Sequence, residues 1–363
     1  MIVFDLDEIS YLTNLRSYQT KFSSNFRAYL YLDFENSNYI LFSDKISKEI
    51  EIKNLTFKKL EEFEDFIQSI DKEIVVDIDK ITLNNFLNIA KPIENKKKNL
   101  ALFASIKPLS VIQHLILASK KVDKAILNFR KNLKEGMSEL ELVELFENEL
   151  LRQGAVDVSF KTILALEENS ASIHYSSYDK NKKLEKENII LLDCGGYFEG
   201  GYATDITRTF YFGNNPKKIH KTIYTQVLKS FIRAFLSDET NAKKLEEKTR
   251  KILKPFENEG FYFNHSLGHG IGTSVHQNPP RLSLVSKDII KPYQVHSIEP
   301  GLYGKDKNGI EFGVRIENCV YFDVNYKRYS LSKFPFEEVL IEYNLLTKAE
   351  EEFIRNWQEN FKC

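Results

Sequence analysis

Five residues in the C-terminal two-thirds of the chain have side chains that could bind two metal ions together. Each lies in a stretch typical of a strand or strand end, with glycine or a turn nearby. Four carboxylates and one imidazole form an oxygen-rich ligand set, which suits Mn²⁺, Co²⁺ or Zn²⁺. Two ions that share carboxylates can hold a hydroxide that attacks a carbonyl carbon, so the set indicates a hydrolase. The five residues are Asp193, Asp205, His269, Glu299 and Glu317.

The two aspartates flank a predicted hairpin. Asp193 belongs to an apolar run, Ile189 to Cys194, that predicts a buried strand; Tyr202 to Phe212 predicts its partner after a Gly-Gly turn. A hairpin would place Asp193 and Asp205 on opposite arms, within reach of one ion or a pair. Aspartate near glycine is commonly a turn residue, but a buried carboxylate needs a partner. From this pair alone, a turn role and a metal-ligand role both remain open.

The segment from Phe263 to Pro280 holds three of the seven histidines. His265 and His269 are spaced as on a helix, but the surrounding glycines oppose a helix. One alternative is a glycine-rich loop with incidental imidazoles. We expect instead that one histidine is a metal ligand and that the others, including His276, donate hydrogen bonds to a substrate carbonyl and its developing oxyanion.

Two further acids lie on predicted strands. Ser297 and Glu299 would share one face of a strand, and Arg315 and Glu317 one face of another. A glutamate that points inward just before Pro-Gly is unusual unless it is liganded or paired. For Glu317 the alternative is an ion pair with Arg315, and the two roles are compatible.

The elements that must position these residues divide into two regions. Residues 1–105 read as a small α/β domain that ends near a polar stretch at 94–99, a candidate linker. Residues 106–363 read as α+β, with helices laid over an antiparallel sheet. In the first region, β-branched and aromatic content predicts strands over 27–34, 38–44 and 73–79, and an apolar stripe predicts a helix over 55–70.

Helical spacing in the second region is clearest after Ser110, in a helix that must end by Gly136. A second helix should start at Ser138, where Glu141 completes a capping box, and end at Gly154. The other predicted helices cover 219–236, 242–256 and 348–361. His114 and His220, both on predicted helices, read as surface or core-edge residues.

Composition narrows the class of protein. The chain has 363 residues, a net charge of -1 and a hydrophobic fraction of 42%, so nothing favours nucleic acid or an anionic membrane as a partner. No apolar run approaches the roughly 20 residues of a membrane span. The N-terminus carries acids where a signal peptide would carry bases. Three scattered cysteines form no disulfide framework, and a cytoplasmic location is expected.

Taken together, the motifs DCGG, TDITRTF, HSLGHGIG, SIEPGLY and GVRIEN resemble those of the pita-bread metallopeptidases, in the Xaa-Pro aminopeptidase and prolidase branch. The similarity runs from about Ser105 to the C-terminus. SASIHYSS, at Ser170 to Ser177, is similar to that branch's substrate-histidine segment. The N-terminal region, with YLTNL at Tyr11 to Leu15, is similar to the creatinase-like domain. The resemblance implies a creatinase-like domain at 1–105 and a pita-bread catalytic domain at 106–363.

The resemblance also implies how the metal ions are held. Asp193 would bind one ion, Asp205 and Glu317 would bridge both, and His269 and Glu299 would complete the second. Glu299 would in addition act as general base and pass a proton to the leaving nitrogen. Two divalent ions are expected, Mn²⁺ first, with Co²⁺ or Zn²⁺ as alternatives.

The same resemblance assigns the remaining site residues. His276 would stabilise the tetrahedral intermediate, and His265 and His174 would contact the residue after the scissile bond. Arg315 would orient a carboxylate ligand. Arg281 would meet the C-terminal part of a short substrate.

The activity implied is hydrolysis of the bond between an N-terminal residue and proline in short proline-containing peptides, by a homodimer. Xaa-Pro aminopeptidase is the first expectation. Xaa-Pro dipeptidase is the alternative, because the N-terminal domain is short; a non-catalytic pita-bread binding protein is the third, opposed by the intact ligand set.

The sequence departs from the usual pattern of that family at two motif positions. The interval from Asp193 to Asp205 is one residue longer, and Gln277 replaces an acid. Cys194, beside a ligand, should point into the core.

Overall fold

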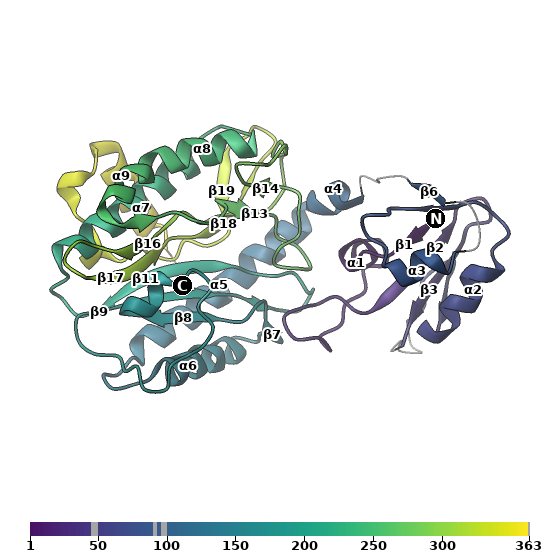
Figure 1. Cartoon of the computed structure of the whole chain (residues 1–363), viewed down its shortest axis with the longest axis horizontal. Coiled ribbons are helices and arrows are strands. Elements are labelled where there is room, and N and C mark those ends of the chain that lie inside the picture. Colours follow the sequence, from purple (N-terminus) through teal and green to yellow (C-terminus); the bar gives the residue numbers. More distant parts are fainter. Residues whose placement is uncertain (45–49, 90–92, 96–99, 362–363) are drawn as a thin grey trace. The chain divides into compact units, whose positions relative to one another are not determined.

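The computed structural model describes residues 1–44, 50–89, 93–95 and 100–361. The chain forms two compact units, Met1–Ala104 and Ser105–Cys363, each described by itself below (Figure 1). Most of the predicted linker, residues 96–99, lies outside the described residues, as does Cys363. The first two residues of that linker belong instead to a strand, β6 (Ile93–Asn95).

The first unit contains a four-stranded sheet in the order β1-β2-β3-β4 and a parallel pair of strands, β5 and β6. Its first three strands are antiparallel neighbours, whereas β3 and β4 run parallel. The elements are β1 (Ile2–Val3), α1 (Leu6–Thr13), β2 (Ala28–Asp33), β3 (Asn38–Ser43), β4 (Leu55–Lys58), η1 (Leu60–Glu62), α2 (Phe63–Ser69), β5 (Ile74–Val76), α3 (Leu83–Leu87) and α4 (Leu100–Ser105), whose last residue belongs to the second unit.

The helix predicted over 55–70 is wrong in its first part. Residues 55–58 form β4, and α2 begins only at Phe63. The predicted apolar stripe is confirmed within α2, because Phe63 and Ile67 are buried in the core of the unit. Thr56 and Phe57 suit a strand, and their backbone groups extend the sheet from β3, so strand pairing outweighs helical spacing here.

The second unit is α+β, as predicted. Its helices are α5 (Leu109–Lys131), α6 (Glu139–Arg152), α7 (Lys218–Leu236), α8 (Ala242–Leu253) and α9 (Lys348–Glu359), with short 3₁₀ helices η2 (Glu167–Ala171), η3 (Lys254–Glu259), η4 (Glu338–Leu340) and η5 (Tyr343–Leu345). Its strands are β7 (Asp157–Val158), β8 (Ile163–Leu166), β9 (Asn188–Cys194), β10 (Gly196–Tyr197), β11 (Ile206–Phe212), β12 (Phe261–Tyr262), β13 (Gly268–His269), β14 (Arg281–Leu282), β15 (His296–Ile298), β16 (Gly301–Lys305), β17 (Glu311–Arg315), β18 (Asn318–Phe322) and β19 (Arg328–Ser330).

Two helix pairs cover the strands of this unit. In Figure 1, α6 is drawn below β8 and β9, α5 runs obliquely past these strands, and α7 and α8 are drawn above β16 and β17. One core joins α5 and α6 to alternate residues of the central strand β9, namely Ile190, Leu192 and Cys194. Because side chains alternate along a strand, Asp193 points to the opposite face. The same alternation confirms Cys194 as a buried core residue, fully shielded from solvent.

Local signals for helix ends are confirmed. Ser138 and Glu141 form the predicted capping box at the start of α6. Gly154, after its end, has a φ of +87°, a left-handed conformation that favours glycine. The predicted helix over 242–256 stops earlier, at Leu253, because Pro255 cannot continue an α-helix and η3 follows.

Among the described residues, no helix combines the length and the apolar character that a membrane span requires.

The predicted hairpin is formed by β9 and β11, which pair antiparallel. Its second strand begins at Ile206 and not at Tyr202, so Asp205 lies just before the ladder. The hydroxyl of Thr204 donates to the carbonyl of Gly196 and accepts from its N–H, so side-chain hydrogen bonds reinforce the backbone bond from Thr204 N–H to the same carbonyl. A second correction concerns His220, which is fully buried inside α7 and not at the core edge.

Candidate metal centre

A cavity of about 380 Å³ in the second unit collects nine of the ten predicted site residues. It lies where β9, β11, β13 and β17 approach one another. Apolar side chains also line it, among them Phe160, Ile163 and Ile173. The nine predicted residues are His174, Asp193, Asp205, His265, His269, His276, Glu299, Arg315 and Glu317.

The register of the β9–β11 hairpin explains how Asp193 is held. Thr207 lies directly opposite Asp193. Arg315 of β17 donates from Nη2 to Asp193 Oδ2 at 2.6 Å and from Nε to Thr207 Oγ1 at 3.1 Å. The Thr207 hydroxyl in turn donates to Glu317 Oε2 at 2.6 Å. The ion pair of Arg315 is thus with Asp193, and its link to Glu317 runs through Thr207.

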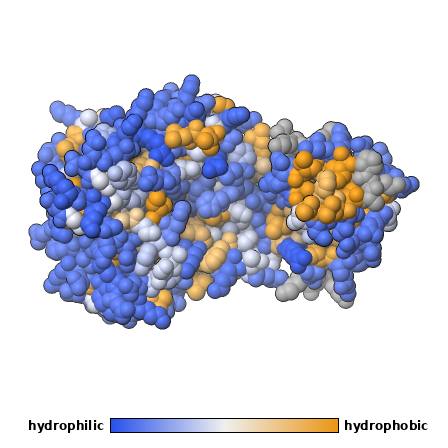
Figure 2. All heavy atoms as spheres, in the orientation of Figure 1, coloured by the Kyte–Doolittle hydropathy of each residue, from blue (hydrophilic) through white to orange (hydrophobic). Residues whose placement is uncertain are grey.

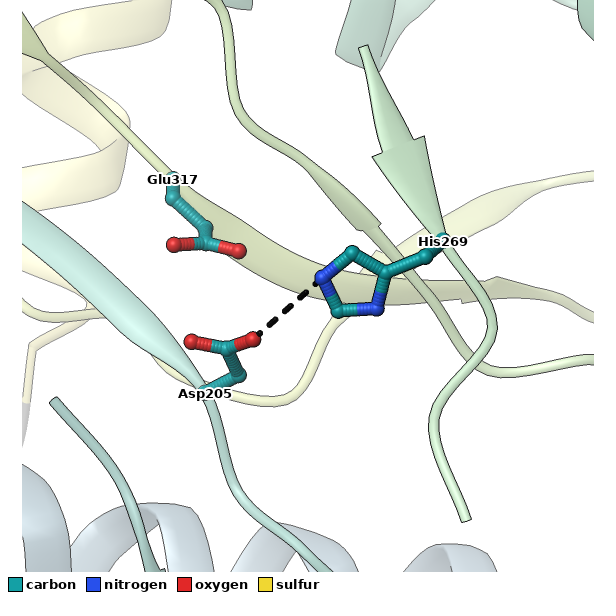
Figure 3. A group of neighbouring side chains, drawn as sticks. All are labelled: Asp205, His269 and Glu317. Atoms are coloured by element: carbon teal, nitrogen blue, oxygen red, sulfur yellow. Dashed lines mark ion pairs between the residues drawn. The ribbon is translucent and has the colours of Figure 1, made fainter. Parts of the chain in front are cut away.

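Beside this hydrogen-bond network lies a cluster of side chains whose oxygen and nitrogen atoms are suited to bind a metal ion. The ligand atoms of Asp205, His269 and Glu317 all fall within 4.8 Å of one another, and Figure 3 shows the three side chains converging from separate elements. Nε2 of His269 lies 3.6 Å from Asp205 Oδ2 and 3.4 Å from Glu299 Oε1. These separations are too long for good hydrogen bonds. An ion bonded to each atom at about 2 Å would hold them roughly 3 Å apart.

Several carboxylate oxygens of this centre are buried without a partner. Asp193 Oδ1, Asp205 Oδ1 and Glu317 Oε1 accept no hydrogen bond from any of the described residues. A buried anionic oxygen that loses its water without gaining a donor is costly. The donor set, carboxylates with one imidazole, matches what divalent Mn²⁺, Co²⁺ or Zn²⁺ binds. The residues therefore fit a metal centre.

Burial and mutual repulsion dominate the electrostatics. Burial, together with neighbouring carboxylates such as Glu299 and Asp193, raises the pKa of Asp205 and of Glu317 well above the usual range. Burial also raises the pKa of Glu299 to about 8. Burial lowers the pKa of His269 to about 3. A neutral imidazole is the form that binds a metal, and added positive charge would relieve the repulsion between the acids.

The substrate side of the cavity carries three histidines. His276 lies against His269, with ring centroids 4.2 Å apart. His265 places Nε2 at 2.9 Å from the hydroxyl of Tyr303, to which Arg315 Nη1 donates at 2.7 Å. Burial lowers the pKa of His265 to about 3. His174 lines the cavity from the exposed segment after η2.

Sequence reasoning missed three residues that hold this centre together. Tyr303 lies inside the SIEPGLY motif, and Thr207 lies inside TDITRTF, yet neither received a role. Ser297 donates to Glu299 Oε1 at 3.0 Å and accepts from the N–H of His269 at 3.0 Å. The spacing of two residues between Ser297 and Glu299 places both side chains on one face of a strand, and this sequence signal could have identified Ser297. The partners of Tyr303 and Thr207 depend on strand pairing and have no local signal.

Arg281 is the exception among the predicted site residues. It pairs with His269 through the backbone of β13 and β14, but its side chain is exposed and does not line the cavity. The expectation that Arg281 meets the substrate is therefore not supported. Gln277, where an acid was expected, instead accepts a buried hydrogen bond from Lys107 Nζ at 2.8 Å.

Comparisons with known proteins show the family of each unit. Residues 113–323 match the profile of Metallopeptidase family M24, and residues 1–111 that of the Creatinase/Prolidase N-terminal domain. An Xaa-Pro dipeptidase of Pyrococcus horikoshii is 31% identical over 74% of this chain and 75% of its own. Human Xaa-Pro aminopeptidase 2 is 30% identical over 76% of this chain and 40% of its own.

Among solved structures, the prolidase from Pyrococcus furiosus has a TM-score of 0.75 at 25% identity. The similarity covers 91% of this chain and 95% of that chain. Both units thus have counterparts in that structure. The chain belongs to metallopeptidase family M24, with a creatinase/prolidase N-terminal domain ahead of a pita-bread catalytic domain.

Proposed function

We propose that this protein is a two-metal exopeptidase that hydrolyses the bond between an N-terminal residue and proline in short peptides. The observation that carries the proposal is the buried cluster of carboxylates and one neutral imidazole, with three partnerless oxygens facing one cavity. The relatives named as Xaa-Pro peptidases support the choice of substrate.

Five side chains would hold the ions: Asp193, Asp205, His269, Glu299 and Glu317. When bound, two such ions supply Lewis acidity and a water activated for attack on a carbonyl carbon. Mn²⁺ is our first choice because the set is oxygen-rich; Co²⁺ and Zn²⁺ are the alternatives. Arg315 orients Asp193 through the 2.6 Å contact.

Proton transfer is assigned to Glu299. Its carboxylate would take the proton of the attacking water and carry it to the leaving nitrogen of proline. Ser297 holds Oε1 of this side chain, which leaves Oε2 free to exchange the proton. His276, whose pKa burial lowers, would donate its N–H to the oxyanion as the carbonyl becomes tetrahedral. No other carbonyl polariser is needed from the chain.

Substrate positioning is assigned to the remaining cavity residues. His265 and His174 would contact the carbonyl and ring of the proline that follows the scissile bond. Tyr303 fixes His265 through the 2.9 Å contact, so the imidazole is oriented before substrate enters. The apolar side chains of Phe160, Ile163 and Ile173 offer surfaces for the proline ring and the residue before it.

On substrate length we favour the Xaa-Pro dipeptidase activity over the aminopeptidase activity first expected from the sequence. The dipeptidase of Pyrococcus horikoshii is matched over three-quarters of both chains, whereas the human aminopeptidase is matched over 40% of its length. The aminopeptidase stays the second candidate, because that relative still covers 76% of this chain.

Side-by-side kinetics of the Mn²⁺-loaded protein on Ala-Pro, Ala-Pro-Ala and longer Ala-Pro peptides tests the proposal. We expect Ala-Pro to have the highest kcat/KM. Faster cleavage of Ala-Pro-Ala would establish the aminopeptidase instead. Cleavage of none of them, with metal bound, would reject both and leave a binding protein.

A further inference from the structure

One positively charged side chain of the cavity has no role in the chemistry above. Lys161 lies two residues before β8 and lines the cavity with His174 and Ser176. Its side chain is exposed, so it stands on the side of the cavity that solvent reaches. The other lysine or arginine of the lining, Arg315, is 2% exposed and committed to Asp193.

The ammonium group of Lys161 is held in place. Its Nζ donates to the backbone carbonyl of Ser176 at 2.6 Å and lies 5.0 Å from the centre of the Tyr178 ring. The Tyr178 hydroxyl donates in turn to the carbonyl of Thr162, which fixes the ring. A surface lysine normally samples many rotamers, whereas this one is confined between a carbonyl and an aromatic face.

That ammonium group has donors to spare. A lysine offers three N–H bonds, and one goes to Ser176. In the part of the chain that the structure describes, Lys161 forms no ion pair with an acidic side chain. The acids of the cavity, Asp193, Asp205, Glu299 and Glu317, are all assigned to metal. Lys161 is therefore the cation left to meet an anionic group of the substrate.

We propose that Lys161 binds the C-terminal carboxylate of a short peptide substrate and makes the enzyme selective for a free carboxyl end. This inference rests on the proposed function and refines its substrate class. A dipeptide places its carboxylate directly after the proline ring, close to the scissile bond. Lys161 takes the role that the sequence assigned to Arg281, whose side chain lies outside the cavity.

Matched acids and amides test the inference: Ala-Pro with its amide, and Ala-Pro-Ala with its amide. We expect the wild type to prefer the acid. Lys161→Met should raise KM for the acid roughly two- to fivefold, the effect of an exposed charge pair, with kcat and the amide nearly unchanged. Lys161→Arg should retain most of the preference. Lys180→Met, an exposed lysine outside the cavity lining, is the control and should change nothing.

The outcomes separate the competing explanations. Equal use of acid and amide by the wild type, or an unchanged ratio in Lys161→Met, overturns the inference. A parallel loss on acids and amides would mean that Lys161 only supports the fold. Ala-Pro-Glu amide has a carboxylate in its side chain alone; if Lys161→Met impairs only this peptide, the C-terminal assignment is wrong.

Failure of the proposed function would be visible separately. If the wild type cleaves none of the peptides, calorimetric titration of Ala-Pro and its amide onto the Mn²⁺-loaded wild type still measures carboxylate recognition. Tighter binding of the acid, abolished by Lys161→Met, supports the inference without turnover. Equal affinities contradict it.

Discussion

Among single side chains, Asp205 and Glu317 differ from ordinary buried acids because each faces other acids across one cavity. Burial and these neighbours raise both pKa values, so an ionised pair is stable only if cations neutralise it. The same reasoning makes both residues sensitive to the loss of one negative charge. The resemblance implies that each carboxylate is shared by two ions, so its loss should affect both ions at once.

Replacing either shared acid by its amide should therefore lower metal content and activity together. We expect Asp205→Asn and Glu317→Gln to bind clearly less than two ions per chain and to lose at least about 100-fold in turnover. Elemental analysis of the purified variants checks this, with the exposed Glu352→Gln of α9 as the control. A fully metallated and active Glu317→Gln protein would disprove the assignment.

His276 should behave differently, because we place it at the oxyanion and not at a metal. His276→Ala should keep both ions yet lose roughly 10²–10³-fold in kcat, the usual effect of one such donor. His269→Ala, which removes a ligand, is the comparison. Should His276→Ala lose metal as readily as His269→Ala, the two roles assigned here are wrong.

Much of the site was predictable from residue types and motifs. Acids on or beside predicted strands and the histidines of a glycine-rich segment predicted seven of the residues that line one cavity, and the family resemblance added His174 and Arg315. Arg281 failed because a motif position does not say which way a side chain of a two-residue strand points. No role was predicted for Thr207 and Tyr303, because their hydrogen-bond partners are more than ten residues away in the chain.

Among the secondary-structure elements, those with local signals were predicted best. The capping box at Ser138 and the hairpin of β9 and β11 depend on neighbouring residues. The β4 strand depends on pairing with β3 across the sheet, which helical spacing at 55–70 could not reveal. The burial of His220 is of the same kind, since Tyr211 and Phe312 enclose its ring from other elements.

His220 gives a test of stability against pH. Burial lowers its pKa from 6.5 to about 4, and neither ring nitrogen has a hydrogen-bond partner among the described residues. Between pH 6.5 and about 4 the unfolded chain therefore binds the proton and the folded chain does not. The free energy of unfolding falls through this window as pH drops, and below about pH 4 His220 adds no further loss.

His220→Phe should remove that dependence and relieve two unpaired nitrogens. We expect the variant to gain about 1 kcal/mol at pH 7 and roughly 3 kcal/mol more, relative to the wild type, at pH 4. Urea unfolding at both pH values measures the difference. The carboxylates of the cavity titrate in both proteins, so their contributions cancel when the two free energies of unfolding are compared. Equal pH dependence in the two proteins would contradict the buried neutral histidine.

For the assembled protein, the resemblance implies a homodimer, and the first unit offers a surface for it. Figure 2 shows an apolar patch on this unit where Figure 1 draws α3. Leu83, Phe86 and Leu87 of α3 are exposed, with Leu83 at 73% and Leu87 at 70%. A contiguous exposed apolar patch is typical of an interaction site.

We predict that Leu83→Ser combined with Leu87→Ser shifts the protein from a dimer to a 42.4 kDa monomer in analytical ultracentrifugation. Leu151→Ser, an exposed leucine of the second unit, is the control and should leave the dimer intact. A wild-type protein that sediments as a monomer at micromolar concentration would remove the premise. Dimers in the double variant would place the contact elsewhere.

The central claim is that two ions held by these five side chains carry the hydrolysis. Its most direct test is a titration of the metal-free protein with Mn²⁺ while Ala-Pro hydrolysis is followed. The account predicts that activity rises from near zero and saturates at two ions per chain, and that Glu317→Gln saturates neither binding nor activity. Full activity without metal, or none with two ions bound and every Ala-Pro peptide left intact, would contradict it.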